Sequence, residues 1–383
     1  MTASTDEVHE AQPVVGSQRL QPGQHRPHRI AIVAPPWYPV PPTGYGGIEL
    51  VVAMLAEQLR GDGLDVPLLA GEGSRMATHI AAPPQWRADL GGRRECVRAL
   101  TYASRVMHTL EELGPLDLIH DHCGGATLFA LSTRGIAPVI HTVHGPLGDP
   151  DADFYAALPR STRLVAISEA QRATAPSLPW VATVHNAVDL DQLAVSGDGE
   201  RDDDGYLLCL ARICYDKGQD VALEVAARTG MRLVLAGKVE ATPEGRSFFE
   251  HCVEPAIDGD RVVYLPNVAG QAKTRLLSRA TALLAPLRWE EPFGLNLVEA
   301  MASGTPAIAF ARGAAPELLG DGVTGFLVDD VDGMVDAVSR VDEIDRRACA
   351  AATRERFSPA AMARAYRAAY AATVGSSRLA VAD

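Results

Sequence analysis

The sequence predicts an α/β protein of two domains, each built on a parallel sheet with helices on both of its faces. Short, continuous apolar runs alternate along the chain with amphipathic stretches, which is the pattern of buried parallel strands joined by helices. The runs fall into two sets, and 383 residues suit two domains of ordinary size. The first set is Ile30–Ala34, Val66–Ala70, Leu116–His120, Pro138–Val143, Leu164–Ile167 and Val181–His185. The second set is Tyr206–Leu210, Arg232–Ala236, Arg261–Leu265, Ala282–Ala285 and Ala307–Phe310.

A polar, glycine-rich segment, Ser196–Gly205, separates the two sets and is the best candidate for a linker. Its three consecutive aspartates, Asp202–Asp204, precede a strand instead of ending one, so we interpret them as solvated linker residues and not as a metal site. The predicted domains are therefore residues 28–190 and 205–358. Residues 1–27 are polar and aperiodic, which predicts a disordered tail, and residues from about 375 onward have the same character.

Composition excludes several classes of function. The 48 acidic and 35 basic residues give a net charge of -13, which disfavours nucleic acid and anionic membranes as partners and requires a locally basic pocket for any anionic ligand. The six cysteines follow no metal-binding spacing. No stretch is long and apolar enough to span a bilayer, and the N-terminus lacks a hydrophobic signal segment. We expect a cytoplasmic protein that is not an integral membrane protein.

The segment Trp289–Pro306 carries the most information in the second domain. It follows an apolar strand, and Pro292 and Gly294 predict a turn into a helix from Leu295 to about Ser303. The first backbone N–H groups of a helix have no partner within it, so those of Phe293, Gly294 and Leu295 form a ready anion site.

Two glutamates, Glu291 and Glu299, flank this helix start eight positions apart. At helical rise per residue the spacing corresponds to about 12 Å. The carboxylate pair of a retaining glycosidase is only ~5 Å apart, so this pair suits the two ends of one extended ligand instead.

This segment resembles the E-x7-E signature of the family 4 retaining glycosyltransferases, including the flanking E-P-F-G and E-A-M-A-x-G-T-P. The resemblance implies the GT-B fold, in which two Rossmann-like, doubly wound domains face a central cleft and a last helix, here residues 359–374, crosses back onto the first domain. It also implies that Glu291 contacts hydroxyls of the donor sugar and that Glu299 contacts the ribose, with Phe293, Gly294 and Leu295 at the phosphates between them.

The segment Leu210–Gly218 is similar to the G-R-x4-K-G motif of the same family, with Ala211 in place of the first glycine. By this resemblance Arg212 and Lys217 grip the diphosphate, for which a guanidinium and an ammonium are suited. Lys238, at the end of the next strand, is expected to add to this positive field, and the family resemblance implies that Val268 lines the pocket of the base.

In the first domain, Gly46 and Gly47 precede a helix that begins at about Ile48. Their place in the family pattern puts them against the donor phosphates. They do not belong to a dinucleotide fingerprint, because Glu49 stands where G-x-G-x-x-G requires its third glycine. A nicotinamide oxidoreductase is therefore the weakest alternative.

The segment Ile140–Gly145 resembles the part of the family pattern that carries an active-site histidine, which places His144 near the donor sugar. His120 and His122 alternate along another strand, and two histidines without a third ligand do not make a zinc site. We expect no metal and no cofactor.

These resemblances predict retaining transfer of a hexose-type sugar from a nucleoside-diphosphate sugar to an unidentified hydroxyl acceptor, which could be a glycan, a glycolipid or a small metabolite. One alternative is a sugar-nucleotide epimerase, which is not expected to carry the E-x7-E segment. Another is a non-catalytic protein that binds nucleotide sugars, against which the retained Glu291, Arg212 and Lys217 argue. The base and sugar of the donor, and the oligomeric state, stay open.

Overall fold

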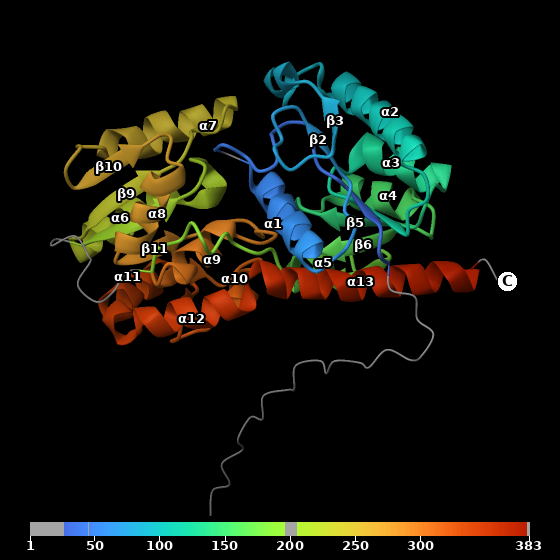
Figure 1. Ribbon diagram of the computed structural model, residues 1–383. Coiled ribbons are helices and arrows are strands. Elements are labelled where there is room, and N and C mark those ends of the chain that lie inside the picture. Colours follow the sequence, from blue (N-terminus) through green and yellow to red (C-terminus); the bar gives the residue numbers. More distant parts are fainter. Residues whose placement is uncertain (1–26, 45, 196–204, 381–383) are drawn as a thin grey trace, which may run out of the picture.

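The computed structural model describes residues 27–44, 46–195 and 205–380 of the chain. Two α/β domains lie side by side, and the long C-terminal helix runs beneath the first of them (Figure 1). Each domain has one parallel sheet, so the predicted fold class is confirmed. The predicted aspartate-rich part of the linker, and the predicted tail apart from residue 27, lie outside the described residues.

The first domain contains a seven-stranded sheet in the order β3-β2-β1-β4-β5-β6-β7, with every pairing parallel. Its strands are β1 Ile30–Val33, β2 Leu68–Gly71, β3 His79–Ala82, β4 Leu118–Asp121, β5 Val139–Val143, β6 Arg163–Ala166 and β7 Trp180–Thr183. Its helices are α1 Gly47–Gly61, α2 Glu95–Leu113, α3 Gly125–Arg134, α4 Asp149–Ala157 and α5 Glu169–Thr174, with a short 3-10 helix, η1, at Pro84–Asp89.

The second domain contains a six-stranded sheet in the order β10-β9-β8-β11-β12-β13, again with parallel pairings. Its strands are β8 Tyr206–Leu210, β9 Arg232–Ala236, β10 Val262–Leu265, β11 Ala282–Ala285, β12 Ala307–Phe310 and β13 Gly325–Val328. The principal helices are α6 Gln219–Thr229, α7 Pro243–Phe248, α8 Gly270–Arg279, α9 Leu295–Ala302, α10 Ala315–Leu318, α11 Val331–Arg340, α12 Arg346–Arg356 and α13 Pro359–Ala380. Short turns of helix lie at Tyr215–Lys217 (η2), Phe249–Val253 (η3), Glu254–Ala256 (η4) and Val341–Glu343 (η5).

Two strands were missing from the predicted set, and both lie at sheet edges. β3 pairs only with β2, and its Ile80 is 53% exposed, so it does not show the continuous apolar run of an inner strand. β13 reads Gly-Phe-Leu-Val and follows a glycine-rich turn, so its apolar run is too short to stand out.

The end of the last helix was also predicted wrongly, because α13 continues past Val374 to Ala380. Alanine, arginine and leucine favour helix in this stretch, and a single Gly375 is tolerated. The helix crosses onto the first domain, where Tyr366 and Tyr370 are fully buried in the core formed with α1 and the sheet.

The domains touch through Glu317 of α10. Its carboxylate accepts hydrogen bonds from the backbone N–H groups of Glu169 and Ala170 at the start of α5, each at 3.0 Å, and it lies 3.0 Å from Nε2 of His185. Burial raises the pKa of Glu317, but these hydrogen bonds outweigh it and leave the pKa below its usual value.

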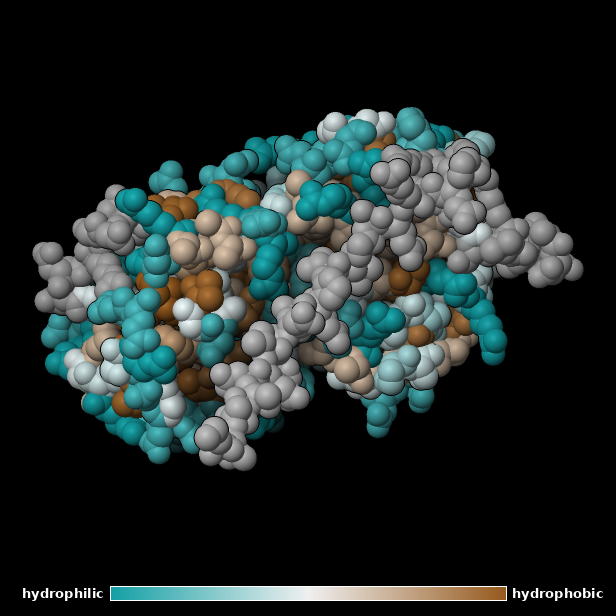
Figure 2. All heavy atoms as spheres, turned by 90° about the horizontal axis from the view of Figure 1, so that it is seen from below, coloured by the Kyte–Doolittle hydropathy of each residue, from teal (hydrophilic) through white to brown (hydrophobic). Residues whose placement is uncertain are grey.

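Hydrophilic residues predominate on the face that Figure 2 shows. Figure 2 views the molecule from the side on which α12 and α13 lie, and hydrophilic residues are spread over both domains there, with smaller hydrophobic groups between them. Within the described residues, no helix is sufficiently long and apolar to cross a membrane.

Candidate active site

The start of α9 forms the centre of the site. Gly294 caps the helix with a φ of 99°, a conformation that a side chain would strain. The Leu297 N–H donates the first bond, to the Gly294 carbonyl at 3.0 Å. The N–H groups of Phe293, Gly294 and Leu295 make no hydrogen bond to any other described residue. The structure therefore leaves a cluster of unpaired amides at the positive end of the helix dipole.

Lys217 and Glu291 meet beside this helix start. The Lys217 ammonium donates to Oε2 of Glu291, and the Trp289 indole N–H donates to the same oxygen at 3.1 Å. The ammonium also lies 4.7 Å from the centre of the Trp289 ring. Both charged side chains are largely buried, with 14% and 16% exposure, so the pair is only weakly screened by solvent.

A second ion pair fixes the loop that carries Glu291. Arg288 donates both terminal guanidinium nitrogens to the Asp220 carboxylate, each at 2.7 Å, and its backbone N–H donates to the Asp216 carbonyl at 2.8 Å. Sequence reasoning missed this clamp. It joins the turn that holds Lys217 to the segment that holds Glu291, so both ends of their contact are positioned.

Glu299 has its own cation. Lys273, on the first turn of α8, donates to Oε1 of Glu299 at 2.6 Å, and the glutamate side chain is 11% exposed. Nothing in the sequence pattern marked Lys273. The side chain of Arg212, in turn, pairs with Glu240 at 3.1 Å and is 54% exposed. Glu299 and Arg212, both predicted to contact the donor substrate, are thus each paired with a residue of opposite charge.

The expected separation of about 12 Å between Glu291 and Glu299 assumed a helical rise over the whole interval. The helix begins at Leu295, so Glu291 lies four residues before it and the helical rise does not apply to the whole interval. The two carboxylates nevertheless have separate environments, because one contacts Lys217 and the other contacts Lys273.

The start of α1 lies directly against the start of α9. A Cβ added at Gly47 would lie 3.3 Å from Cδ1 of Leu295, so the two helix N-termini, one from each domain, lie close to each other. The buried Gly46 precedes α1, and the carboxyl group of Glu49 lies in its first turn. Burial raises the pKa of Glu49 from 4.5 to about 7.

His144 follows β5 at the carboxyl end of the first sheet. Its Nε2 lies 2.8 Å from Nδ1 of the buried His122, and burial lowers the pKa of His144 to about 3. His141 is directed elsewhere, with its Nδ1 2.7 Å from Oδ2 of Asp121. In the described part of the chain, no group of three or more His, Cys, Asp or Glu side chains could hold a metal ion.

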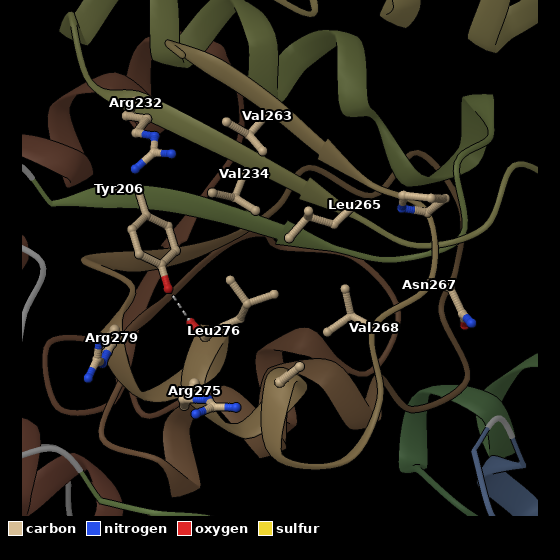
Figure 3. A pocket seen from close by; sticks show the side chains of 12 residues that line it. Tyr206, Arg232, Val234, Val263, Leu265, Asn267, Val268, Arg275, Leu276 and Arg279 are labelled. Carbon is tan, nitrogen blue, oxygen red and sulfur yellow. Dashed lines mark hydrogen bonds between the residues drawn. The ribbon is translucent and has the colours of Figure 1, made fainter. Parts of the chain in front are cut away.

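Two further predicted residues are Lys238 and Val268. Lys238 is exposed, and its carbonyl accepts a 2.8 Å hydrogen bond from Ile213. Val268 lines a pocket of about 600 Å³ between α8 and strands β8, β9 and β10 (Figure 3). Figure 3 shows Asn267 and Val268 at one end of this pocket, and Arg232 and Arg279 at the other.

Comparison with known proteins agrees with this geometry. Residues 45–192 match the profile described as "Glycosyltransferase Family 4", and residues 195–362 match "Glycosyl transferases group 1". Two such α/β domains with this site define a glycosyltransferase of the GT-B type. The chain belongs to glycosyltransferase family 4.

Its relatives include the D-inositol 3-phosphate glycosyltransferases of Mycolicibacterium smegmatis and Mycobacterium avium. The first is 28% identical over 87% of this chain and 87% of the relative, and the second is 29% identical over 88% and 91%.

Solved structures share the fold. A glycosyltransferase involved in avilamycin A biosynthesis has a TM-score of 0.64 and 24% identity, with 91% of this chain and 98% of that chain covered. HepE of Anabaena in complex with UDP-glucose has a TM-score of 0.66 and 16% identity, with coverage of 92% and 99%. At these identities the likeness establishes the GT-B fold alone.

Proposed function

We propose that the protein transfers a hexose-type sugar from a nucleoside-diphosphate sugar to a hydroxyl acceptor, with retention of configuration at the anomeric carbon. The observation that carries the proposal is the unpaired amide cluster at the start of α9, flanked by Lys217 and Glu291 and opposed by the start of α1. Amides and an ammonium suit a diphosphate, and a carboxylate beside them suits sugar hydroxyls.

The proposed reaction uses the donor's own phosphate as the base. The acceptor oxygen bonds to the anomeric carbon as the bond from that carbon to the phosphate oxygen breaks. The departing phosphate oxygen takes the acceptor's proton on the same face of the sugar. Lys217, Arg212 and the α9 amides stabilise the charge that develops on the diphosphate, and Glu291 orients the sugar.

Binding of the donor requires an exchange of partners in this proposal. Lys217 turns from Glu291 to the phosphate, and the freed Glu291 carboxylate accepts hydrogen bonds from the sugar. Glu299 and Lys273 receive the ribose, and Val268 contacts the base. We also propose that the protein acts in the cytoplasm, since all six cysteines are free thiols.

The test is a panel of uridine, guanosine, adenosine and thymidine diphosphate hexoses, each supplied with and without acceptors. D-inositol 3-phosphate belongs in the acceptor panel because it is named in the relatives. Release of nucleoside diphosphate that depends on an acceptor, together with an NMR spectrum of the product's anomeric proton, would establish transfer and its stereochemistry. An inverted product refutes retention, and an epimerised nucleotide sugar favours the epimerase alternative.

Nucleotide binding must be measured in parallel to distinguish the enzyme from a non-catalytic nucleotide-sugar-binding protein. Nucleoside diphosphates should raise the melting temperature, because a ligand that binds only the folded state stabilises it. Stabilisation without any turnover across the panel would favour a non-catalytic nucleotide-sugar-binding protein. No shift at millimolar nucleotide would contradict both proposals.

A further inference from the structure

One hydrogen bond joins the rings of His122 and His144, and the surroundings of His122 decide which of the two rings donates it. The hydrogen bond joins Nδ1 of His122 to Nε2 of His144 at 2.8 Å, and the ring centroids are 5.2 Å apart. Burial lowers the pKa of both rings, so each ring is neutral and carries a single N–H. Only one of the two facing nitrogens can therefore be the donor.

The second nitrogen of His122 distinguishes the two possible arrangements. Nε2 of His122 is buried and has no hydrogen-bond partner in the part of the chain that the structure describes. If His144 were the donor, the only proton of His122 would sit on this buried Nε2 as an unpaired N–H. If His122 is the donor, its Nε2 is a bare lone pair. An orphaned N–H group is the rarer feature of protein interiors, since a buried donor without a partner loses a hydrogen bond to water.

The ring of His122 is also packed in place. It lies 4.0 Å, between centroids, from the ring of His120. His120 is fixed at both nitrogens, by the hydroxyl of Tyr370 on α13 and by the hydroxyl of Thr142 on β5, each at 2.8 Å. Tyr370 of the crossing helix α13 thus helps to fix the ring of His120, against which His122 packs.

We propose that His122 is a positioning residue that holds His144 as the tautomer protonated on Nδ1, so that His144 presents a hydrogen-bond donor to a ligand in the cleft. Nδ1 of His144 has no partner among the described residues, and the His144 side chain is partly exposed whereas His122 is buried. A donor at this position contacts an oxygen of the sugar or phosphate and cannot remove a proton from the acceptor.

This inference rests on the proposed function only for the identity of the ligand oxygen. Because His144 supplies no base in this tautomer, the acceptor's proton must go elsewhere, and the departing phosphate is the group that the proposed reaction provides. The tautomer itself is a property of the unliganded protein, so it can be tested without a donor.

The experiment is NMR spectroscopy of the full chain labelled with nitrogen-15 in histidine, at neutral pH. Ring nitrogen shifts and their couplings to ring protons identify which nitrogen of each histidine carries the proton, and a His144→Gln spectrum assigns the signals. We expect Nδ1–H on both His122 and His144. A proton on Nε2 of His144 would overturn the proposal.

Variants then test whether His122 is the cause. His122→Phe keeps a ring but removes the donor, so His144 should redistribute toward its Nε2–H tautomer. His122→Asn returns an N–H donor near the place of Nδ1 and should restore the wild-type signals. With a donor sugar found by the panel, kcat should fall about tenfold in His122→Phe, with little change in KM, because one neutral hydrogen bond is lost.

Thr142→Val is the matched control. It removes a partner of His120 at comparable depth and leaves the His122 contact with His144 intact. It should lower stability while the His144 signals stay unchanged. An equal tautomer shift in Thr142→Val and His122→Phe would show a general packing effect and refute the proposal, as would an unchanged His144 tautomer in folded His122→Phe. If His122→Phe does not fold, the wild-type and His122→Asn spectra decide.

Discussion

Replacing Glu291 by glutamine should separate sugar transfer from nucleotide binding. In the unliganded protein this carboxylate holds the Lys217 ammonium, the group proposed to grip the diphosphate. Glu291→Gln removes that competitor and one negative charge beside the expected anion. Free nucleoside diphosphate should therefore bind as well as it does to the wild type, or more tightly, although transfer is impaired.

The magnitude follows from the exposure of the pair. Two unit charges about 4 Å apart attract by ~1 kcal/mol in water and ~4 kcal/mol at an effective dielectric of 20. Side chains with 14% and 16% exposure lie between these limits, so the unliganded variant should lose about 1–2 kcal/mol of stability. Nucleotide binding should tighten by no more than about tenfold. Loss of a charge-assisted hydrogen bond to the sugar should lower kcat/KM by about ten- to a hundredfold.

Calorimetric titration with nucleoside diphosphate, beside initial transfer rates, measures both effects. Glu299→Gln is the matched comparison, because Glu299 also pairs with a lysine but is assigned to the ribose, which donor and product both contain. It should weaken nucleoside diphosphate binding by about tenfold. If Glu291→Gln weakens nucleotide binding and Glu299→Gln does not, the donor lies along α9 in the opposite direction.

Three further predictions address the charges of the site. Lys217→Ala should weaken nucleoside diphosphate binding and lower kcat, each by about tenfold or more, because the ammonium contacts the diphosphate before and during bond cleavage. Unchanged titrations and rates would show that Lys217 does not contact the diphosphate. Glu49→Gln should stabilise the protein by about 3 kcal/mol at pH 8 and by almost nothing near pH 4, as measured by urea unfolding. Folding raises the pKa of Glu49 from 4.5 to about 7, so the wild-type protein loses stability as the pH rises between those two values. Equal stabilities of the variant and the wild type at pH 8 would contradict this. Transfer should survive EDTA, since Lys217, Arg212 and the α9 amides are proposed to balance the diphosphate charge; loss of activity that a divalent ion restores would refute that assignment.

The sequence was most informative where short-range patterns decide structure. The inner strands, the start of α9 at Leu295 and the turn at Gly294 follow from apolar runs and glycine chemistry, and the observed elements agree. The edge strands β3 and β13 were not predicted, because an edge strand needs no long apolar run.

The side-chain contacts of the site could not be predicted from the sequence, because they join residues far apart in the chain. Lys273 meets Glu299 across 26 positions, and the His122 contact with His144 spans 22. Glu317 was not among the predicted site residues, yet it accepts hydrogen bonds from the start of a helix in the other domain. Such contacts depend on how α8, β5 and α10 are placed, and no local pattern reports that placement.

The partners found in the structure also explain how so acidic a chain can offer an anion site. Among the described residues, Lys217, Lys273 and Arg212 each pair with a carboxylate, so their positive charges are compensated before a ligand binds. In the proposed function, the diphosphate would take the place of the carboxylate beside each cation, and new charge-assisted hydrogen bonds would offset the cost of separating the ion pair. The most exposed of these cations, Arg212 at 54%, loses least by the exchange, whereas Lys217 must leave a buried carboxylate. In the proposed reaction, the step that commits the site to its donor is therefore the release of Lys217 from Glu291, which would free the carboxylate for the sugar as the ammonium reaches the phosphate.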